Sequence, residues 1–147
     1  EWLFTYALPT VKQSTYISYE SYVRLHLEPA LGTSKLTALT VELLQRFFNQ
    51  KKQSLSPKSL RNIYNMLHNC LDQAVTNGYL MRNPLQGVKL PQVTKKEILI
   101  LTQEEQNALH MSAQESHTIA TFGIIFTLST GIRMGEMLGL QWGDVDY

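Results

Sequence analysis

Apolar residues recur at helical spacing along most of the chain, and several of these stretches begin with a residue that favours a helix start. The first stripe predicts a helix over about residues 15–27, with Ser14 as its N-cap and with Pro29 and Gly32 closing it. Its apolar positions are Tyr16, Tyr19, Val23 and Leu27. Before it, residues 2–8 alternate between apolar and polar side chains, which predicts an extended arm.

Two further helices are predicted before residue 79. One begins at Thr40, and its inward-facing residues are expected to be Val41, Leu44, Phe47 and Phe48. The other begins at Ser56-Pro57, a capping hydroxyl followed by a proline whose missing N–H costs nothing there, and ends at Asn77-Gly78. Its apolar positions are Leu60, Ile63, Leu67, Leu71 and Ala74. These helices predict a small bundle on which residues 79–85 fold back.

The pattern changes after residue 87. Residues 88–97 contain Pro91, β-branched residues and two adjacent lysines, which favour an extended linker. We therefore place a domain boundary near residue 95, between a domain over 1–94 and another over 95–147. In the second domain, Thr102 and Glu105 predict a capping box that begins a helix to about Ala113. A helix over 119–128 follows, apolar around most of its circumference, as expected of a buried helix.

Composition places the chain among folded proteins. The sequence has 147 residues, 44% apolar and 17% charged, enough for one domain or two small ones. No apolar run reaches the roughly 18 residues that a membrane span needs, and no secretion signal opens the sequence. The single Cys70 excludes an internal disulfide and suits a reducing compartment. Since it lies in an apolar helical pattern, we expect a packed thiol rather than a nucleophile.

The net charge of +1 conceals two oppositely charged parts. Residues 1–96 contain 12 Lys and Arg against 5 Asp and Glu, a net +7, whereas residues 97–147 contain 1 against 7, a net −6. Such asymmetry indicates that the basic part binds a polyanion. The alternative is that its scattered lysines only keep the surface hydrated.

Candidate chemistry lies near the end of the sequence. Gly131 lacks a Cβ and lets the chain turn sharply just before Arg133, and Glu136 follows Arg133 by three residues, on the same face of a helix. The planar guanidinium suits the non-bridging oxygens of a phosphodiester and stays charged at any workable pH. On spacing alone, an ordinary surface ion pair worth roughly 0 to 1 kcal/mol is the simpler interpretation.

The longer string favours the first interpretation. T-G-I-R-M-G-E-M-L-G-L-Q-W-G-D-V-D, over residues 130–146, resembles the first-arginine motif of tyrosine recombinases, the integrases of phages and conjugative transposons. Earlier segments, among them S-P-K-S-L-R-N and L-T-Q-E-E-Q, are similar in order to the core-binding domain and the start of the catalytic domain. The resemblance implies a mainly α fold: a small SAM-like helical core-binding bundle, a linker, and the N-terminal helices of a mixed α/β catalytic domain.

The resemblance also implies a function. Members of the family recombine DNA at specific sites, integrating or excising mobile elements through a 3′-phosphotyrosyl intermediate, with neither a metal nor another cofactor. Arg133 matches the first of two catalytic arginines, and Glu136 matches a supporting acid. The implied partners are double-stranded DNA of the recombination site and other integrase protomers, tetrameric in the synaptic complex, with no membrane. The implied location is the prokaryotic cytoplasm, in association with the nucleoid.

Residues expected to bind DNA cluster at the start of the third helix. A helix N-terminus and two cations can meet phosphates there, and Asn62 can reach an adenine edge. The linker lysines are expected to cross the DNA backbone, and Thr15 is a weaker candidate. The full set is Lys58, Ser59, Arg61, Asn62, Lys95, Lys96 and Thr15. For each, the alternative is an ordinary hydrated surface.

Several parts of the family's active site have no match in the sequence. The family also has a β-hairpin lysine, a His-x-x-Arg element, a further His or Trp and the nucleophilic tyrosine, all downstream of the first arginine. No histidine here is followed three residues later by Arg, and Tyr147 comes only 14 residues after Arg133. We therefore expect a piece of a longer integrase that is inactive by itself, with exposed apolar surface around 119–128 and a tendency to self-associate. The alternatives are a short non-catalytic DNA-binding regulator and a helical protein-interaction module.

Overall fold

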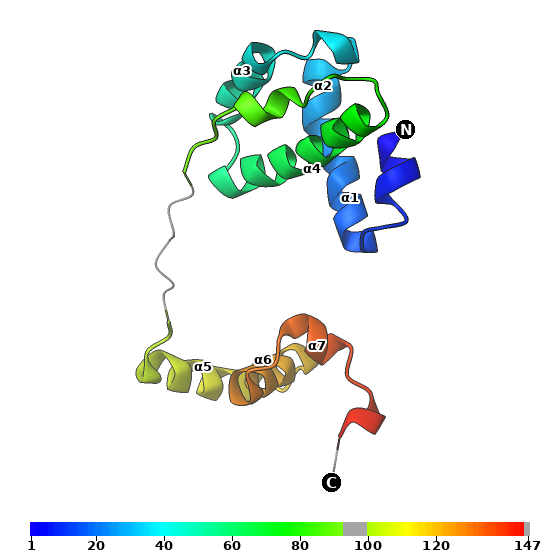
Figure 1. Cartoon of the computed structure of the whole chain (residues 1–147). Helices are drawn as coiled ribbons and strands as arrows, with labels where there is room; N and C mark the ends of the chain where they lie inside the picture. The colour runs from blue at the N-terminus through cyan, green and yellow to red at the C-terminus, as the bar shows by residue number, and fades with distance from the viewer. Residues whose placement is uncertain (93–99, 146–147) are drawn as a thin grey trace. The chain divides into compact units, whose positions relative to one another are not determined.

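The computed structural model describes residues 1–92 and 100–145 and divides the chain into two compact units, Glu1–Lys95 and Lys96–Tyr147 (Figure 1). Within the described residues the secondary structure is helical and contains no strand. The prediction of a mainly α fold is therefore confirmed. No helix in this described part of the chain is both long and apolar enough to cross a membrane.

In residues 1–92, the described part of the first unit, four α-helices are joined by shorter helical turns. The α-helices are α1 (Gln13–Tyr22), α2 (Glu28–Leu31), α3 (Val41–Lys51) and α4 (Pro57–Thr76). The turns are the π-helical η1 (Leu3–Ala7) and η2 (Val23–Leu27) and the 3₁₀ segments η3 (Leu36–Ala38) and η4 (Pro84–Gly87).

Local chemistry sets the ends of α3 and α4 as predicted. The Thr40 hydroxyl accepts a hydrogen bond from the Leu43 N–H at 3.2 Å, and the Ser56 hydroxyl accepts one from the Ser59 N–H at 3.1 Å. Each cap satisfies a backbone donor that has no partner inside the helix. After α4, Gly78 adopts a left-handed conformation with φ of 76°, which lets the chain turn back.

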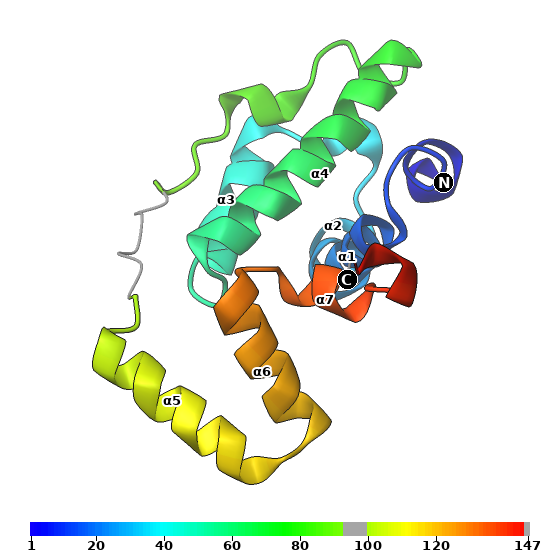
Figure 2. The same cartoon turned by 90° about the horizontal axis from the view of Figure 1, so that it is seen from below.

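The prediction of an extended arm over residues 2–8 is wrong, because these residues form the helical turn η1. The Leu8 N–H donates to the Leu3 carbonyl at 2.8 Å, and Ala7 is buried. Trp2 packs on Tyr19 with ring centroids 6.1 Å apart, while the Tyr6 hydroxyl accepts a hydrogen bond from Asn77. Figures 1 and 2 place this turn beside α1 and the end of α4. Contacts with distant residues have overridden the local alternation.

The predicted boundaries of the first helix also need correction. The helix begins at Gln13, with Lys12 rather than Ser14 at the N-cap and no capping side chain. Pro29 does not end the helical path, because it lies in the first turn of α2, where a proline is tolerated. The predicted single helix is therefore three consecutive segments, α1, η2 and α2.

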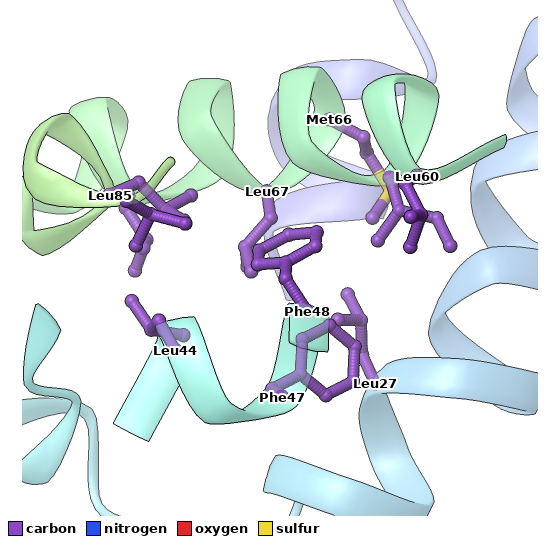
Figure 3. Packing of buried hydrophobic residues seen from close by; sticks show 11 residues of the cluster. Leu27, Leu44, Phe47, Phe48, Leu60, Met66, Leu67 and Leu85 are labelled. Atoms are coloured by element: carbon purple, nitrogen blue, oxygen red, sulfur yellow. The ribbon is translucent and has the colours of Figure 1, made fainter. Parts of the chain in front are cut away.

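The core of this unit lies between α3 and α4 (Figure 3). Phe47 and Phe48 of α3 meet edge to face, with ring centroids 5.0 Å apart, and Phe48 also contacts the Tyr64 ring. The buried residues that fill this core are Leu27, Leu44, Phe47, Phe48, Leu60, Ile63, Met66, Leu67, Leu71, Leu85 and Val88. Val41, predicted to face inward, is instead 37% exposed at the start of α3.

The segment after α4 folds back on the bundle through a buried asparagine. Asn83 is 4% exposed, and its amide donates to the Asp72 carboxylate at 2.7 Å and to the His68 carbonyl at 3.1 Å. Its own carbonyl oxygen accepts from the Leu85 N–H at 2.9 Å. Further on, the Gln45 side chain exchanges two hydrogen bonds with the Lys89 backbone. These bonds fix the path of the chain as it leaves the unit.

The second unit contains α5 (Gln103–Ser116), α6 (Ile119–Thr130), α7 (Met134–Leu138) and the 3₁₀ turn η5 (Trp142–Asp144). The capping box that starts α5 is confirmed: the Thr102 hydroxyl accepts from the Glu105 N–H, and the Glu105 carboxylate accepts from the Thr102 N–H. The bonds that the Thr102 N–H and, at 3.1 Å, the Thr102 hydroxyl donate to the charged carboxylate lower the pKa of Glu105.

Helix α6 is not buried as its composition predicts. Ile119 is 93% exposed and Phe122 is 69% exposed, and Gly123 is the buried residue of the helix. The reason is that α6 packs against α5 and α7 on one side only, where Met137 lies over Gly123. The expectation of exposed apolar surface around residues 119–128 is thus confirmed.

Replacing Asn83 with alanine should destabilise the first unit by about 1 to 3 kcal/mol. The substitution leaves the buried Leu85 N–H without its acceptor, and such a group retains its desolvation cost. Gln50→Ala, at an exposed position of α3, is the control and should change stability by less than about 0.5 kcal/mol. Urea unfolding followed by circular dichroism measures both. Equal stability of the two variants would contradict a structural role for Asn83.

Candidate nucleic-acid interface

The turn between α6 and α7 places Arg133. Helix α6 ends at Gly131, which has a left-handed φ of 70° and donates its N–H to the Thr127 carbonyl at 2.9 Å. A side chain would strain this conformation, so the prediction that glycine permits the turn is confirmed. Two residues later, Arg133 is the N-cap of α7 in an extended conformation.

Glu136 holds Arg133 at two points. One carboxylate oxygen accepts from the Arg133 backbone N–H at 3.0 Å, and the other lies 3.0 Å from Nη1 of the guanidinium. Arg133 therefore precedes α7 rather than sharing a helix face with Glu136, and the carboxylate folds back to reach it. The guanidinium has five N–H donors and the ion pair occupies one of its nitrogens, so the fork can also bind a second anion.

The pair lies in solvent, with side-chain exposures of 85% for Arg133 and 53% for Glu136. An ion pair this exposed contributes little to stability, since water and salt screen it. Its more important effect is to orient a fixed positive charge on an accessible surface. That is the property needed to bind a phosphodiester.

The predicted residues at the start of α4 fall into two groups. Lys58 and Arg61 are exposed, and their charges are available to an approaching polyanion. Ser59 is half-buried and already engaged, because its N–H donates to Ser56 and its hydroxyl lies 2.9 Å from the Ser56 hydroxyl. Ser59 thus contributes to the cap of the helix. Lys95 and Lys96, the predicted linker contacts, lie outside the described residues.

Thr15 and Asn62, 47 positions apart in the sequence, line one open groove of about 380 Å³ between α1 and α4. The Asn62 amide lies 3.5 Å from the Tyr22 hydroxyl across this groove. Its lining is polar but carries no charged side chain: Ser14, Thr15, Ser18, Tyr19, Tyr22, Asn62 and Asn65. The prediction overlooked Ser18, Tyr22 and Asn65, although helical spacing from Thr15 and Asn62 could have identified them.

Cys70 offers no nucleophile at neutral pH. The thiol is half-buried on α4, and burial raises its pKa to about 11. The expectation of a packed thiol is consistent with this environment. Within residues 1–92 and 100–145, no three His, Cys, Asp or Glu side chains are grouped so as to hold a metal ion.

Known proteins that resemble this chain belong to one family. Residues 1–51 match the family model described as "Phage integrase, N-terminal SAM-like domain". The solution structure of the phage integrase SAM-like domain from Moorella thermoacetica is 39% identical to this chain, with a TM-score of 0.53, and the match covers 66% of this chain and 84% of that domain. The chain belongs to the phage integrase family of tyrosine recombinases.

Longer relatives match nearly all of this integrase-family chain. It is 29% identical to a "Tyrosine recombinase XerC-like" protein of Caldanaerobacter subterraneus over 99% of the chain and 39% of that protein. It is 31% identical to the ICEBs1 integrase of Bacillus subtilis over 92% of the chain and 37% of the relative. The chain therefore spans less than two fifths of the length of these two relatives.

Solved integrase structures share the fold. A lambda integrase dimer bound to a COC′ core site matches 99% of this chain and 54% of its own, with 22% identity and a TM-score of 0.83. The Tn1549 transposon integrase bound to circular intermediate DNA matches 96% of this chain and 48% of its own, with 20% identity and a TM-score of 0.78. At this identity the likeness establishes the fold alone.

Glu136→Gln should change the unfolding free energy by less than about 1 kcal/mol. The substitution removes the negative charge of an exposed ion pair but keeps an oxygen that can accept the hydrogen bond from the Arg133 N–H. Glu115→Gln, at an exposed position of α5, is the control. Thermal unfolding of both variants gives the comparison. A loss above about 2 kcal/mol for Glu136→Gln alone would mean that the pair holds the unit together.

Proposed function

We propose that this chain is the DNA-binding part of a site-specific recombinase and carries the first catalytic arginine of its active site. The observation that carries the proposal is the exposed guanidinium of Arg133, held by Glu136 directly after the Gly131 turn within the family's motif. Residues 1–94 are the core-binding domain, and residues 95–147 are the beginning of the catalytic domain.

Arg133 acts on the phosphate that undergoes strand exchange. In the proposed reaction a tyrosine attacks the DNA phosphorus, a 5′-hydroxyl leaves, and a 3′-phosphotyrosyl bond forms. Negative charge grows on the phosphate oxygens in the transition state, and a cation already in place stabilises it without reorganisation. Loss of one such donor typically costs about 3 to 4 kcal/mol of activation free energy. Glu136 positions the arginine and transfers no proton.

The basic first domain supplies most of the affinity for duplex DNA. Its positive charge neutralises phosphates and releases their counterions, which makes binding depend on salt. Lys58 and Arg61 are exposed on α4, the helix that also contributes Asn62 and Asn65 to the polar groove, and this supports their assignment to the DNA backbone. We assign Lys95 and Lys96 to contacts with the DNA backbone where the linker crosses it. Ser59 is assigned to the N-terminal cap of α4, next to Lys58.

Other protomers are the second class of partner. One of the similar solved structures is a lambda integrase tetramer bound to a Holliday junction, which matches this chain with a TM-score of 0.82. We assign the same type of assembly to the protein that contains this chain, acting in the cytoplasm on nucleoid DNA. The exposed apolar residues of α6 are available for contacts within such an assembly.

Binding to a non-cognate duplex should weaken with salt, with a slope of log K against log salt near −3.6. This value corresponds to about four phosphates at about 0.9 each. Lys58→Ala/Arg61→Ala should bring the slope to about −1.8 and weaken binding to every sequence, because two of those contacts are removed. Fluorescence anisotropy across a range of salt concentrations provides the measurement.

Lys35→Ala/Arg82→Ala is the matched control for that double variant, since it removes the same charge from exposed positions elsewhere in the first unit. The control should keep a slope near that of the unmodified chain. Similar slopes for both double variants would assign Lys58 and Arg61 to hydration rather than to DNA contact.

The 147-residue chain alone should form no covalent bond with DNA. Its sequence contains neither a His-x-x-Arg element nor a tyrosine at the family's spacing from Arg133, so the transition state lacks its nucleophile and its second arginine. Incubation with a nicked suicide duplex, followed by denaturing electrophoresis, tests this. A covalent protein–DNA band that Arg133→Ala abolishes would refute the predicted inactivity.

A further inference from the structure

Helix α4 carries three asparagines along one exposed side. Asn62, Asn65 and Asn69 are separated by three and four residues, so they share a face of the helix, and all three are exposed. We call these three residues the amide face. Asparagine is a poorer helix former than alanine, so three of them in one helix lower its intrinsic stability.

Packing of the first unit does not account for the amide face. Asn62 makes one long contact, 3.5 Å to the Tyr22 hydroxyl. Within the described residues, the side chains of Asn65 and Asn69 make no hydrogen bond. Asn83, in contrast, is buried and bonded on both sides of its amide. The amide face therefore has donors and acceptors that remain available to a ligand.

The surroundings of the amide face indicate which ligand it fits. Lys58 lies one turn before Asn62, and Arg61 lies next to it, both exposed at the N-terminal end of α4. The groove beside Asn62 and Asn65 is lined by hydroxyls and rings of α1 and contains no charged side chain. Cations at one end suit phosphates, whereas an uncharged polar strip suits base edges.

The amide face is long enough to reach more than one base pair. At 1.5 Å per residue, Asn62 and Asn69 are about 10.5 Å apart along the helix axis. The major groove is about 12 Å wide and admits an α-helix. An asparagine amide can donate to N7 or accept from N6 of adenine, and it can do both at once in a planar pair.

We propose that the amide face of α4 reads adenine-containing base pairs in the major groove and so sets the sequence preference of this domain. The inference rests on the proposed function, because it requires duplex DNA held by Lys58 and Arg61. It assigns affinity and preference to different residues of the same helix: the cations bind any duplex, and the amides select among duplexes.

Selection from a pool of duplexes with a short randomised segment tests the inference. The unmodified 147-residue chain should enrich adenine at two or more positions within about four base pairs, by about tenfold over the other bases. Asn65→Ala/Asn69→Ala should lose the enrichment at the positions that these two residues contact, while Asn62 keeps its own, and should keep its low-salt affinity for the unselected pool. Its melting temperature should be unchanged or higher, because alanine favours the helix.

Asn49→Ala, an exposed asparagine of α3, is the control and should keep the enrichment. If the unmodified chain binds the pool at low salt but enriches no adenine, or if Asn65→Ala/Asn69→Ala keeps the preference at every position, the inference is overturned and the proposed function stands. If the unmodified chain binds no duplex at low salt, the proposed function fails, and the inference fails with it.

Discussion

The packing of α3 against α4 fixes which side chains of the first unit are buried and which are exposed. Phe48 lies between the helices, in contact with the Phe47 and Tyr64 rings, and Leu44 and Leu60 close the core on either side. Burying this apolar face of α4 determines which residues point the other way. Because a helix has one side in the core, Lys58, Arg61 and the amide face are turned together toward solvent.

In the described residues of the second unit, polar contacts fix the turn that carries Arg133. A glycine in the left-handed conformation ends α6, and the Glu136 carboxylate then binds both the backbone and the side chain of Arg133. In an exposed position these bonds contribute little stability, but they limit the directions that the guanidinium can take. A guanidinium held in this way loses less conformational freedom when it binds an anion than a freely rotating one does.

Several parts of the fold could be predicted because neighbouring residues determine them. The caps at Thr40, Ser56 and Thr102 and the left-handed glycines at 78 and 131 depend on side chains within a few positions. The conformation of residues 2–8 could not be predicted from neighbouring residues. Trp2 packs on Tyr19, and Tyr6 is bonded to Asn77, which is 71 positions away. The alternation of apolar and polar residues is compatible with an extended segment, whereas the contacts with Tyr19 and Asn77 accompany a helical turn.

The sequence by itself determined the starts of α3, α4 and α5, with their caps at Thr40, Ser56 and Thr102, and the arginine motif, since each depends on short-range spacing and on the chemistry of single residues. Tertiary structure alone decided that Asn83 is buried and that Thr15 and Asn62 share a groove. The physical reason is that burial depends on which elements pack together. A residue's own type and its neighbours do not specify the distant partner that covers it.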